Sequence, residues 1–283
     1  MKILVTGVGG QLGYDVCKEL TARGIENRGV DIGDFDITDA AATHAYIADY
    51  RPDAVIHCSA WTAVDKAEDE LETVRAVNTE GPRNIAVACR DIGAKMLYIS
   101  TDYVFPGTGE RFYEPDDPTG PLGAYGATKL GGEQAVRETL ERFFIVRISW
   151  VFGVNGNNFV KTMLRLAQSR SEVSVVCDQI GSPTYTADLA PLLCDMIVTE
   201  QYGVYHATNE GVCSWAEFAR EIFRLAGKHM TVHPIPTSEY PTRATRPLNS
   251  RMSKDKLVEM GFQRLPHWQD ALERYLKEIT ESV

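Results

Sequence analysis

The sequence predicts an α/β protein built on a doubly wound parallel sheet, with a smaller α/β region that is mostly C-terminal. One observation is the start of the chain, where a β-branched run from Lys2 to Thr6 leads into glycines and then into an amphipathic helical pattern that ends at Gly24. The other is the alternation of strand-like runs and helical patterns, which is regular up to about residue 153 and weakens afterwards.

Three glycines follow the first predicted strand at a spacing that suits a phosphate-binding turn. Gly7 permits a tight turn, Gly10 lets a pyrophosphate approach the backbone, and Gly13 lets the helix pack close to the strand. A purely structural turn could use the same residues. The position of the glycines between a strand and a helix favours dinucleotide binding on a Rossmann sheet, so we expect NADH or NADPH as cofactor.

The second predicted strand ends near an acid that bears on the choice between these cofactors. Asp31 can accept hydrogen bonds from ribose hydroxyls and would repel a 2′-phosphate, which favours NADH, although a solvated strand-end acid would look the same. In the next loop Asp36 and Ile37 could lie along an adenine. Thr38 or Asp39 is expected to cap the helix that follows.

Further strands and helices are expected along the chain. The expected strands of the large sheet are residues 28–32, 54–60, 96–102 and 143–148, and one helix is expected to run through residues 77 and 78 towards residue 88. The later expected elements are helices at 159–169, 187–198, 214–226 and 268–280 and strands at 173–177 and 203–207. Ser214 and Glu217 form the pattern of a capping box.

These elements suggest two domains. We expect residues 1–153 to form a dinucleotide-binding Rossmann domain and residues 154–283 to form mainly a substrate-binding domain. Segments near 185–208 could return to the first domain.

Composition excludes several classes of function. The net charge is -10 without a basic block, which argues against a nucleic-acid partner. No apolar run is long enough for a bilayer, and the first residues are too short for a signal sequence, so we expect a cytoplasmic protein without a membrane partner. The six cysteines show neither a Cys-x-x-Cys pair nor a histidine at metal-ligand spacing, which predicts buried free thiols.

Tyr125 and Lys129 form the candidate catalytic pair. Four residues apart in a predicted helix, they lie on one face, and a neighbouring ammonium is expected to lower the phenol pKa from its usual ~10. The pair could then give a proton to a carbonyl that is being reduced, although a solvated helix face would show the same spacing. Thr101, at a strand end, could hold the carbonyl oxygen or act as an ordinary helix cap. His57 is expected to be a core residue.

Longer segments extend this pattern over nearly the whole chain. They are AVDKAE at 63–68, STDYVFPG at 100–107, SWVFG at 149–153, NFVKTML at 158–164, DQIGSPT at 178–184 and RPLNS at 246–250. With the glycine turn and the Tyr125–Lys129 pair, they make the chain resemble the dTDP-4-dehydrorhamnose reductases, a family of extended short-chain dehydrogenases/reductases, from Met1 to about Trp268.

The resemblance implies that NADPH or NADH reduces the C4 ketone of dTDP-4-dehydro-L-rhamnose to dTDP-L-rhamnose, the last step of dTDP-rhamnose biosynthesis for cell-envelope polysaccharides. It implies that Tyr125 donates the proton, Lys129 holds the nicotinamide ribose, and Thr101 holds the oxygen. The implied cofactor residues are Gly7, Gly10, Gln11, Leu12, Gly13, Asp31, Asp36, Ile37, Ala60, Trp61, Thr62, Ile99, Tyr125 and Lys129. The implied substrate residues are Thr101, Asp102, Trp150, Asn158, Arg246 and Asn249, with Arg246 on the diphosphate.

The resemblance also raises the question of a metal. Some members of the family bind Mg²⁺ at a dimer contact through acids on the first helix and after the Pro-Thr loop. Here only Asp15 and Asp188 are candidates, and the register of Asp188 is poor, so we expect neither this metal nor this dimer. The chemistry itself needs no metal, and a monomer or a homodimer would fit.

Three other functions fit parts of the pattern. Related dehydratases carry Thr-Asp-Glu, but here Tyr103 follows Asp102, so their general base is missing. Another NDP-sugar 4-ketoreductase or epimerase would share the Tyr125–Lys129 pair. A non-catalytic NADP-binding regulatory subunit, like that of methionine adenosyltransferase, would share the fold, but Trp150 and the NFVKTML and RPLNS segments favour a working sugar site.

Overall fold

Six parallel strands form the central sheet of the computed structural model, which describes residues 1–281. In spatial order they are β10 (Gly203–His206), β5 (Phe143–Ile148), β4 (Lys95–Thr101), β3 (Ala54–His57), β1 (Lys2–Thr6) and β2 (Glu26–Val30). β1 pairs with β2 on one side and with β3 on the other, so the direction of winding reverses at β1. In doubly wound sheets, ligands bind beside this switch point, at the carboxyl ends of the strands.

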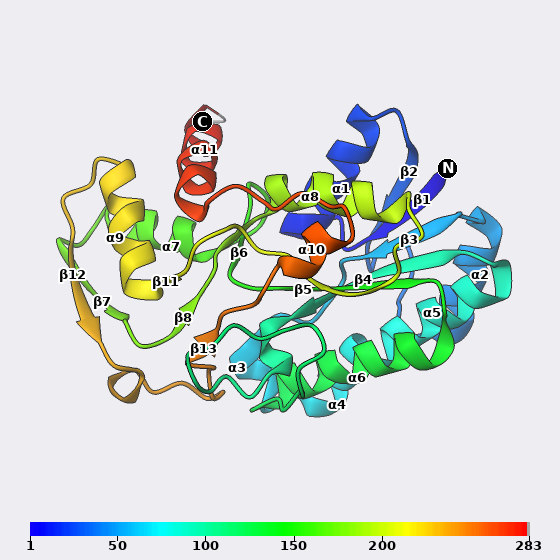
Figure 1. Cartoon of the computed structure of the whole chain (residues 1–283), viewed down its shortest axis with the longest axis horizontal. Helices are drawn as coiled ribbons and strands as arrows, with labels where there is room; N and C mark the ends of the chain where they lie inside the picture. The colour runs from blue at the N-terminus through cyan, green and yellow to red at the C-terminus, as the bar shows by residue number, and fades with distance from the viewer. Residues whose placement is uncertain (282–283) are drawn as a thin grey trace.

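Helices cover both faces of this sheet (Figure 1). On one face lie α1 (Gln11–Ala22) and α8 (Thr186–Ile197), which pack against each other. On the other face lie α2 (Ala40–Tyr50), α5 (Gly81–Ile92) and α6 (Ala124–Thr139). Each layer buries its own apolar cluster against the strands, and the predicted Rossmann fold is confirmed.

The connection between β3 and β4 is less regular than expected. α3 (Val64–Ala67) and α4 (Leu71–Arg75) lead into one π-helical turn, η1 (Ala76–Glu80), before α5 begins. The expected helix through residues 77 and 78 towards residue 88 is therefore present, but it contains one π-helical turn. The amide of Asn78, on the π turn, bonds both the backbone N–H and the carbonyl of Trp61, at 2.9 and 3.1 Å, so the turn supports the segment after β3.

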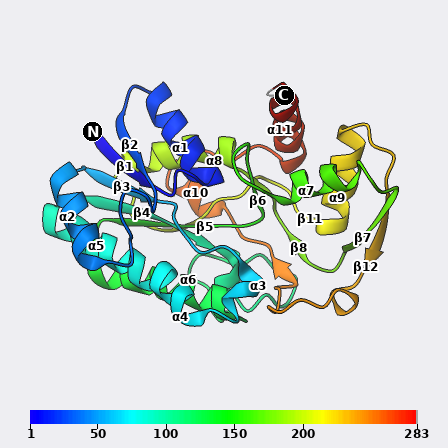
Figure 2. The same ribbon diagram turned by 180° about the vertical axis from the view of Figure 1, so that it is seen from behind.

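The remaining elements form a smaller lobe, which Figures 1 and 2 show beside the large sheet. Its helices are α7 (Phe159–Leu166), α9 (Trp215–Leu225) and α11 (Trp268–Glu281). Its strand pairs are β6 (Val151–Phe152) with β9 (Thr184–Tyr185), β7 (Glu172–Val176) with β12 (Thr231–Ile235), and β8 (Ile180–Gly181) with β11 (Cys213–Ser214) and β13 (Asn249–Ser250). The other short elements are η2 (Asp102–Val104), η3 (Thr237–Glu239) and α10 (Asp255–Glu259), of which α10 packs near β10.

Local signals in the sequence set several of these boundaries. Asp39 caps α2, Gly24 follows α1 with a φ of 69°, and Ser214 and Glu217 form the predicted capping box of α9. α8 and β10 return to the large sheet after the first strands of the smaller lobe. The division at residue 153 into a cofactor and a substrate domain stays a prediction. Within residues 1–281, no helix combines the length and the apolar composition that crossing a membrane would need.

Candidate active site

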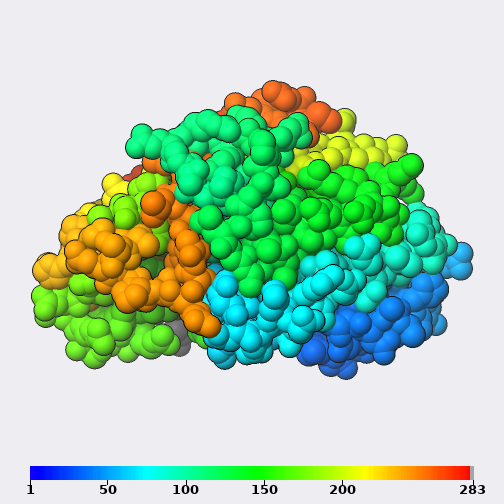
Figure 3. All heavy atoms as spheres, turned by 90° about the horizontal axis from the view of Figure 1, so that it is seen from below, coloured from blue at the N-terminus to red at the C-terminus, as the bar shows by residue number. Residues whose placement is uncertain are grey.

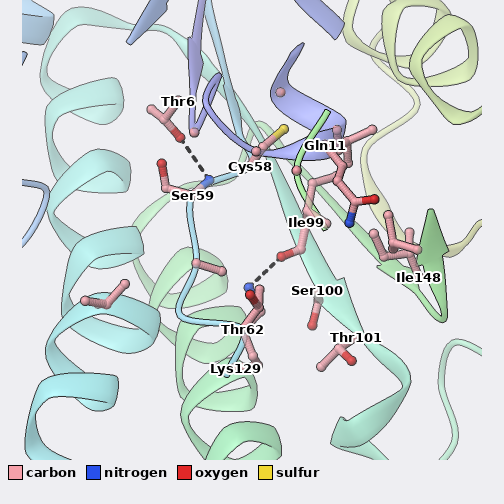
Figure 4. Close-up of a pocket in the computed structure, with 18 of the residues that line it drawn as sticks. Thr6, Gln11, Cys58, Ser59, Thr62, Ile99, Ser100, Thr101, Lys129 and Ile148 are labelled. Carbon is pink, nitrogen blue, oxygen red and sulfur yellow. Dashed lines mark hydrogen bonds between the residues drawn. The ribbon is translucent and has the colours of Figure 1, made fainter. Parts of the chain in front are cut away.

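A pocket of about 730 Å³ opens at the carboxyl ends of the strands, where both the large sheet and the smaller lobe line it. Figure 4 shows part of it, with side chains from β1, β4, β5, α1 and α6 around one space. The predicted site residues that line it are Gly7, Gly10, Gln11, Leu12, Gly13, Asp31, Asp36, Ile37, Ala60, Thr62, Ile99, Thr101, Asp102, Tyr125, Lys129 and Trp150.

The glycine turn forms one wall of the pocket from backbone. Gly7 has a φ of +74°, a conformation that favours glycine, and a Cβ at Gly13 would lie 2.3 Å from the Gly7 carbonyl oxygen. α1 starts directly after Gly10, and no side chain caps its N-terminus. Uncapped N–H groups at a helix N-terminus bind anionic groups, so this wall fits a pyrophosphate.

The acid at the end of β2 lies beside this turn. One carboxylate oxygen of Asp31 accepts the Gly9 N–H at 2.8 Å, and the other accepts the Ile32 N–H at 2.9 Å. Asp36 and Ile37 line the same part of the pocket. On the other side Ala60 and Thr62 line it, whereas Trp61 does not.

Tyr125 and Lys129 face the pocket from the first turns of α6. The Lys129 ammonium donates to the carbonyl oxygen of Ile99 at 2.7 Å and lies 4.2 Å from the centre of the Tyr98 ring (Figure 4). The ring of Tyr103 packs edge-on against that of Tyr125. The two predicted catalytic side chains and Thr101 are therefore brought to one place.

The electrostatics of this pair differ from the expectation. Burial raises the pKa of Tyr125 well above its ordinary value; a hydrogen bond with Thr101 opposes that rise, and the Asp102 charge adds to it. Burial lowers the pKa of Lys129 to about 7, against the opposing effect of Glu133. The shift of the tyrosine pKa is therefore opposite to the expected one, because burial raises it, the Asp102 charge adds to the rise, and the Thr101 hydrogen bond does not offset them.

Asp102 is a third buried ionisable group in the pocket. Its side chain accepts hydrogen bonds from the hydroxyl of Ser250, on β13, and from that of Thr101 at 3.0 Å. Burial raises the pKa of Asp102 to about 6, although these hydrogen bonds oppose the rise. Ser250 lies in the quoted RPLNS segment but was not predicted as a site residue, since no local pattern connects it to Asp102.

Trp150 follows β5 and lines the pocket with a φ of 50°, a left-handed conformation that is rare for a tryptophan. Its indole stacks on that of Trp215, with ring centres 3.8 Å apart and planes 14° from parallel. Trp215 also lines the pocket. Sequence reasoning missed Trp215, whose only signal was its place after the capping residue Ser214.

Three predicted substrate residues lie outside the lining. Arg246 donates to Asp65 at 2.7 Å and to the Tyr103 hydroxyl at 3.3 Å, so it reaches the pocket only through Tyr103. Asn158 caps α7 and donates to the Gln11 side chain at 3.0 Å. Asn249 donates to backbone carbonyls of the loop at residues 108–111.

Arg246 belongs to a strap at residues 240–248 that crosses from the smaller lobe to α3. A second ion pair, Arg243 with Asp69, joins the same two segments. Figure 3 shows the orange segment of this part of the chain against the cyan surface of the segment that contains α3. Two ion pairs therefore hold the strap against the segment that contains α3.

The smaller lobe also reaches the glycine turn. The amide of Asn155 donates to the carbonyls of Gly9 and Gly10 at 2.9 and 3.1 Å, and Gly156 and Asn157 line the pocket. None of these three was predicted. The run of Asn and Gly from 155 to 158 was the only sequence signal, and it indicated a loop rather than a contact.

The two metal candidates are bonded to other groups. Asp15 accepts the Thr186 hydroxyl, and Asp188 pairs with Arg274 at 2.7 Å. Among residues 1–281, no cluster of three or more His, Cys, Asp or Glu side chains could hold a metal ion. The donor set described here therefore does not fit Mg²⁺.

Comparisons with known proteins cover nearly the whole chain. The family model described as the RmlD substrate binding domain matches residues 1–281. The dTDP-4-dehydrorhamnose reductase of Streptomyces griseus is 45% identical over 276 residues, 95% of this chain and 91% of that protein. The dTDP-4-keto-6-deoxy-D-glucose reductase of Streptomyces niveus is 39% identical over 273 residues, 95% of this chain and 94% of that protein.

Solved structures indicate the same family. The crystal structure of dTDP-4-dehydrorhamnose reductase from Bacillus anthracis in complex with NADP is 44% identical, covers 98% of this chain and 100% of that chain, and has a TM-score of 0.96. The resemblance predicted from the motifs is confirmed. The chain belongs to the RmlD substrate binding domain family, that of the dTDP-4-dehydrorhamnose reductases.

Proposed function

We propose that this protein is an oxidoreductase that uses NADPH or NADH to reduce the C4 ketone of dTDP-4-dehydro-L-rhamnose to dTDP-L-rhamnose. One observation carries the proposal: Tyr125, Lys129 and Thr101 line the same pocket as the glycine turn. A proton donor, a cation and a hydroxyl are then available beside a wall that suits a dinucleotide. Members of the family share the name of this activity.

The residues that would hold the cofactor belong to the backbone wall and to α6. The uncapped start of α1 suits the pyrophosphate, Asp31 suits the adenosine ribose, and Lys129 suits the nicotinamide ribose. A bound NADPH or NADH would supply the hydride for the reaction. All other contributions come from side chains of this chain.

Reduction of the ketone adds a hydride to C4 and a proton to its oxygen, which gives a secondary alcohol. In this proposal the Thr101 hydroxyl redirects its hydrogen bond from Asp102 to the ketone oxygen, and Tyr125 gives up its phenolic proton to that oxygen. The raised pKa of Tyr125 keeps the phenol protonated at neutral pH, which is the form that reduction needs. Lys129 is assigned to the nicotinamide ribose, and a proton from solvent restores the phenol after the transfer.

Substrate recognition is assigned to the smaller lobe and the strap. Trp150 and Asp102 line the pocket and would contact the sugar. Arg246 would bind the diphosphate, because a guanidinium with unused N–H groups can add an anionic partner. Either a monomer or a homodimer is compatible with a pocket whose lining comes from one chain. We also propose a cytoplasmic location, which six free cysteines support.

The test is the oxidation of NADPH and of NADH in the presence of dTDP-4-dehydro-L-rhamnose, with an equivalent UDP-4-keto sugar as control. We expect turnover with the dTDP sugar and a much lower kcat/KM with the UDP sugar. No oxidation of either cofactor with the dTDP sugar would contradict the proposal.

A second candidate substrate is dTDP-4-keto-6-deoxy-D-glucose, which the name of the Streptomyces niveus relative suggests. It carries the same C4 ketone and the same dTDP group, so the catalytic residues alone do not separate the two sugars. Measuring both in the assay decides between them. A higher kcat/KM with the glucose-configured sugar would favour this alternative.

A further inference from the structure

The pocket contains a backbone strain that the proposed chemistry does not explain. Trp150 has a φ of 50°, and among the described residues only Arg51 shares this left-handed conformation without being glycine. Arg51 ends α2, where a left-handed residue is common, whereas Trp150 lies between β5 and β6. For a bulky side chain this conformation is unfavourable and persists only when the surroundings fix it.

Two contacts fix the Trp150 side chain. Trp215 stacks on its indole at 3.8 Å, which is close for ring centres, with nearly parallel planes. Gly181 leaves room for the indole, because a Cβ there would lie 2.9 Å from an indole ring atom of Trp150. The pairing of β8 with β11 places Gly181 opposite Cys213, two residues before Trp215. One strand pair thus positions both contacts (Figure 1).

Trp215 is itself held firmly. It is the first residue of α9 and lies between Ser214 and Glu217, which form the capping box. The ring of Phe159, from α7, packs against its indole with centres 4.6 Å apart. Phe218, one turn along α9, packs against both rings. Trp215 therefore connects Trp150 to α7 and α9 through ring contacts.

We propose that Trp215 is a positioning residue that holds Trp150 in its left-handed conformation, so that the indole of Trp150 is already placed to receive the sugar. The inference rests on the proposed function, which assigns Trp150 to the sugar. When the stack is lost, Trp150 relaxes to an ordinary backbone conformation, and only a fraction of the molecules can bind the sugar productively. The apparent affinity for the nucleotide sugar falls in proportion to that fraction.

The test compares Trp215→Leu, which keeps an apolar side chain but removes the stack, with the conservative Trp215→Phe. Trp268→Phe is the matched control, because Trp268 is a buried tryptophan of the same lobe outside the pocket lining. We expect Trp215→Leu to lower kcat/KM for the dTDP-4-keto sugar about tenfold to a hundredfold, mainly through KM. Trp215→Phe should retain most of the activity. The Kd for NADPH should stay within about twofold in all three, because the residues proposed to bind it lie at the start of α1, at Asp31 and on α6, and none lies in the smaller lobe.

Circular dichroism gives a second reading that needs no substrate. Two closely stacked indoles produce a pair of oppositely signed bands, which Trp150→Phe and Trp215→Phe should remove equally and Trp268→Phe should leave. Wild-type kinetics in Trp215→Leu, or an equal loss of NADPH affinity, would overturn the positioning role. If the wild type shows the band pair but reduces no 4-keto sugar, the proposed function fails while the stack itself is confirmed.

Discussion

The two walls of the pocket present different chemical groups, mainly backbone on one wall and side chains on the other. The wall formed by β1, α1 and β2 presents mainly backbone: a glycine turn, an uncapped helix N-terminus and one acid that bonds backbone N–H groups. The wall formed by α6, the ends of β4 and β5 and the smaller lobe presents side chains, and burial shifts the pKa values of Asp102, Tyr125 and Lys129 among them. The first wall depends on the absence of side chains, the second on their burial.

This difference explains how one pocket can serve two ligands. Backbone N–H groups at a helix N-terminus bind a phosphate without the help of a charged side chain. The cofactor wall therefore needs no buried ionisable group. Proton transfer, by contrast, needs groups whose pKa values are shifted by burial. Burying such groups lowers the stability of the folded protein. Substitutions should therefore affect binding on the first wall and chemistry or stability on the second.

The largest effect is expected at the proton donor. Tyr125→Phe removes the phenolic proton but keeps the ring that packs against Tyr103, so turnover should fall by roughly 10²–10⁴. NADPH affinity, measured by fluorescence titration, should be nearly unchanged. Unaltered turnover would show that Tyr125 is not the proton donor. It would also contradict the assignment of the chemistry to the second wall.

Lys129→Met tests the cost of a buried charge. The variant should be inactive but more stable by about 1–4 kcal/mol at about pH 6, the range seen when buried charged groups are replaced by apolar ones. The pKa of Lys129 is lowered from 10.5 to about 7 in the folded protein. Between pH 7 and 10.5 the native state therefore binds fewer protons than the unfolded state. Wild-type stability should therefore rise from pH 7 to 10.5, and the advantage of the variant should shrink.

Urea unfolding at several pH values measures this effect. Lys66→Met, at an exposed lysine of α3, is the control and should change stability by less than about 0.5 kcal/mol. A pH-independent difference between Lys129→Met and the wild type would contradict the lowered pKa of Lys129.

Arg246→Ala tests the strap. If the guanidinium binds the diphosphate, KM for the nucleotide sugar should rise by the equivalent of about 1.5–3 kcal/mol, with little change in the Kd for NADPH. Arg243→Ala is the matched control, since its ion pair with Asp69 joins the same segments but is exposed and worth little. Equal effects of the two variants on KM would mean that both arginines act only by holding the strap against the α3 segment.

Gly13→Ala tests the backbone wall. A methyl group placed 2.3 Å from the Gly7 carbonyl oxygen must push α1 away from the turn, which should cost about 1–3 kcal/mol of stability and weaken NADPH binding. At Gly33 a Cβ would meet no atom within 4 Å, so Gly33→Ala should have neither effect. Normal NADPH affinity in Gly13→Ala would show that the close approach of the helix is not needed.

Asp31→Ala should produce the smallest change. Removing the carboxylate removes its repulsion of a 2′-phosphate, about 1 kcal/mol for charges ~4 Å apart in water. The ratio of kcat/KM for NADPH to that for NADH should therefore increase about fivefold. A constant ratio would assign the cofactor preference to another residue.

The sequence predicts the first wall better than the second, for a physical reason. Gly7 and Gly13 belong to one short turn, and Asp31 follows the next strand, so the order of glycines and strand ends is enough to assign them. Ser250 reaches Asp102 across 148 positions, and Arg246 reaches Asp65 across 181. Such contacts follow from the packing of the smaller lobe, which no periodicity in the sequence encodes.

The errors have the same origin. The resemblance gave Ala60, Trp61 and Thr62 as cofactor residues, but Trp61 does not line the pocket as its two neighbours do, and its role stays a prediction. The pKa of Tyr125 was predicted from a pairwise charge, whereas burial by several elements sets its direction. Trp215 was missed because its role depends on the pairing of β8 with β11.

The most direct test of the central claim is a crystal structure with NADP and dTDP-L-rhamnose bound together. The account predicts that the Tyr125 hydroxyl lies about 2.6–3.2 Å from the sugar O4, with the nicotinamide on the side of the glycine turn. A sugar whose O4 lies closer to another proton donor, or a dinucleotide bound away from that turn, would contradict it.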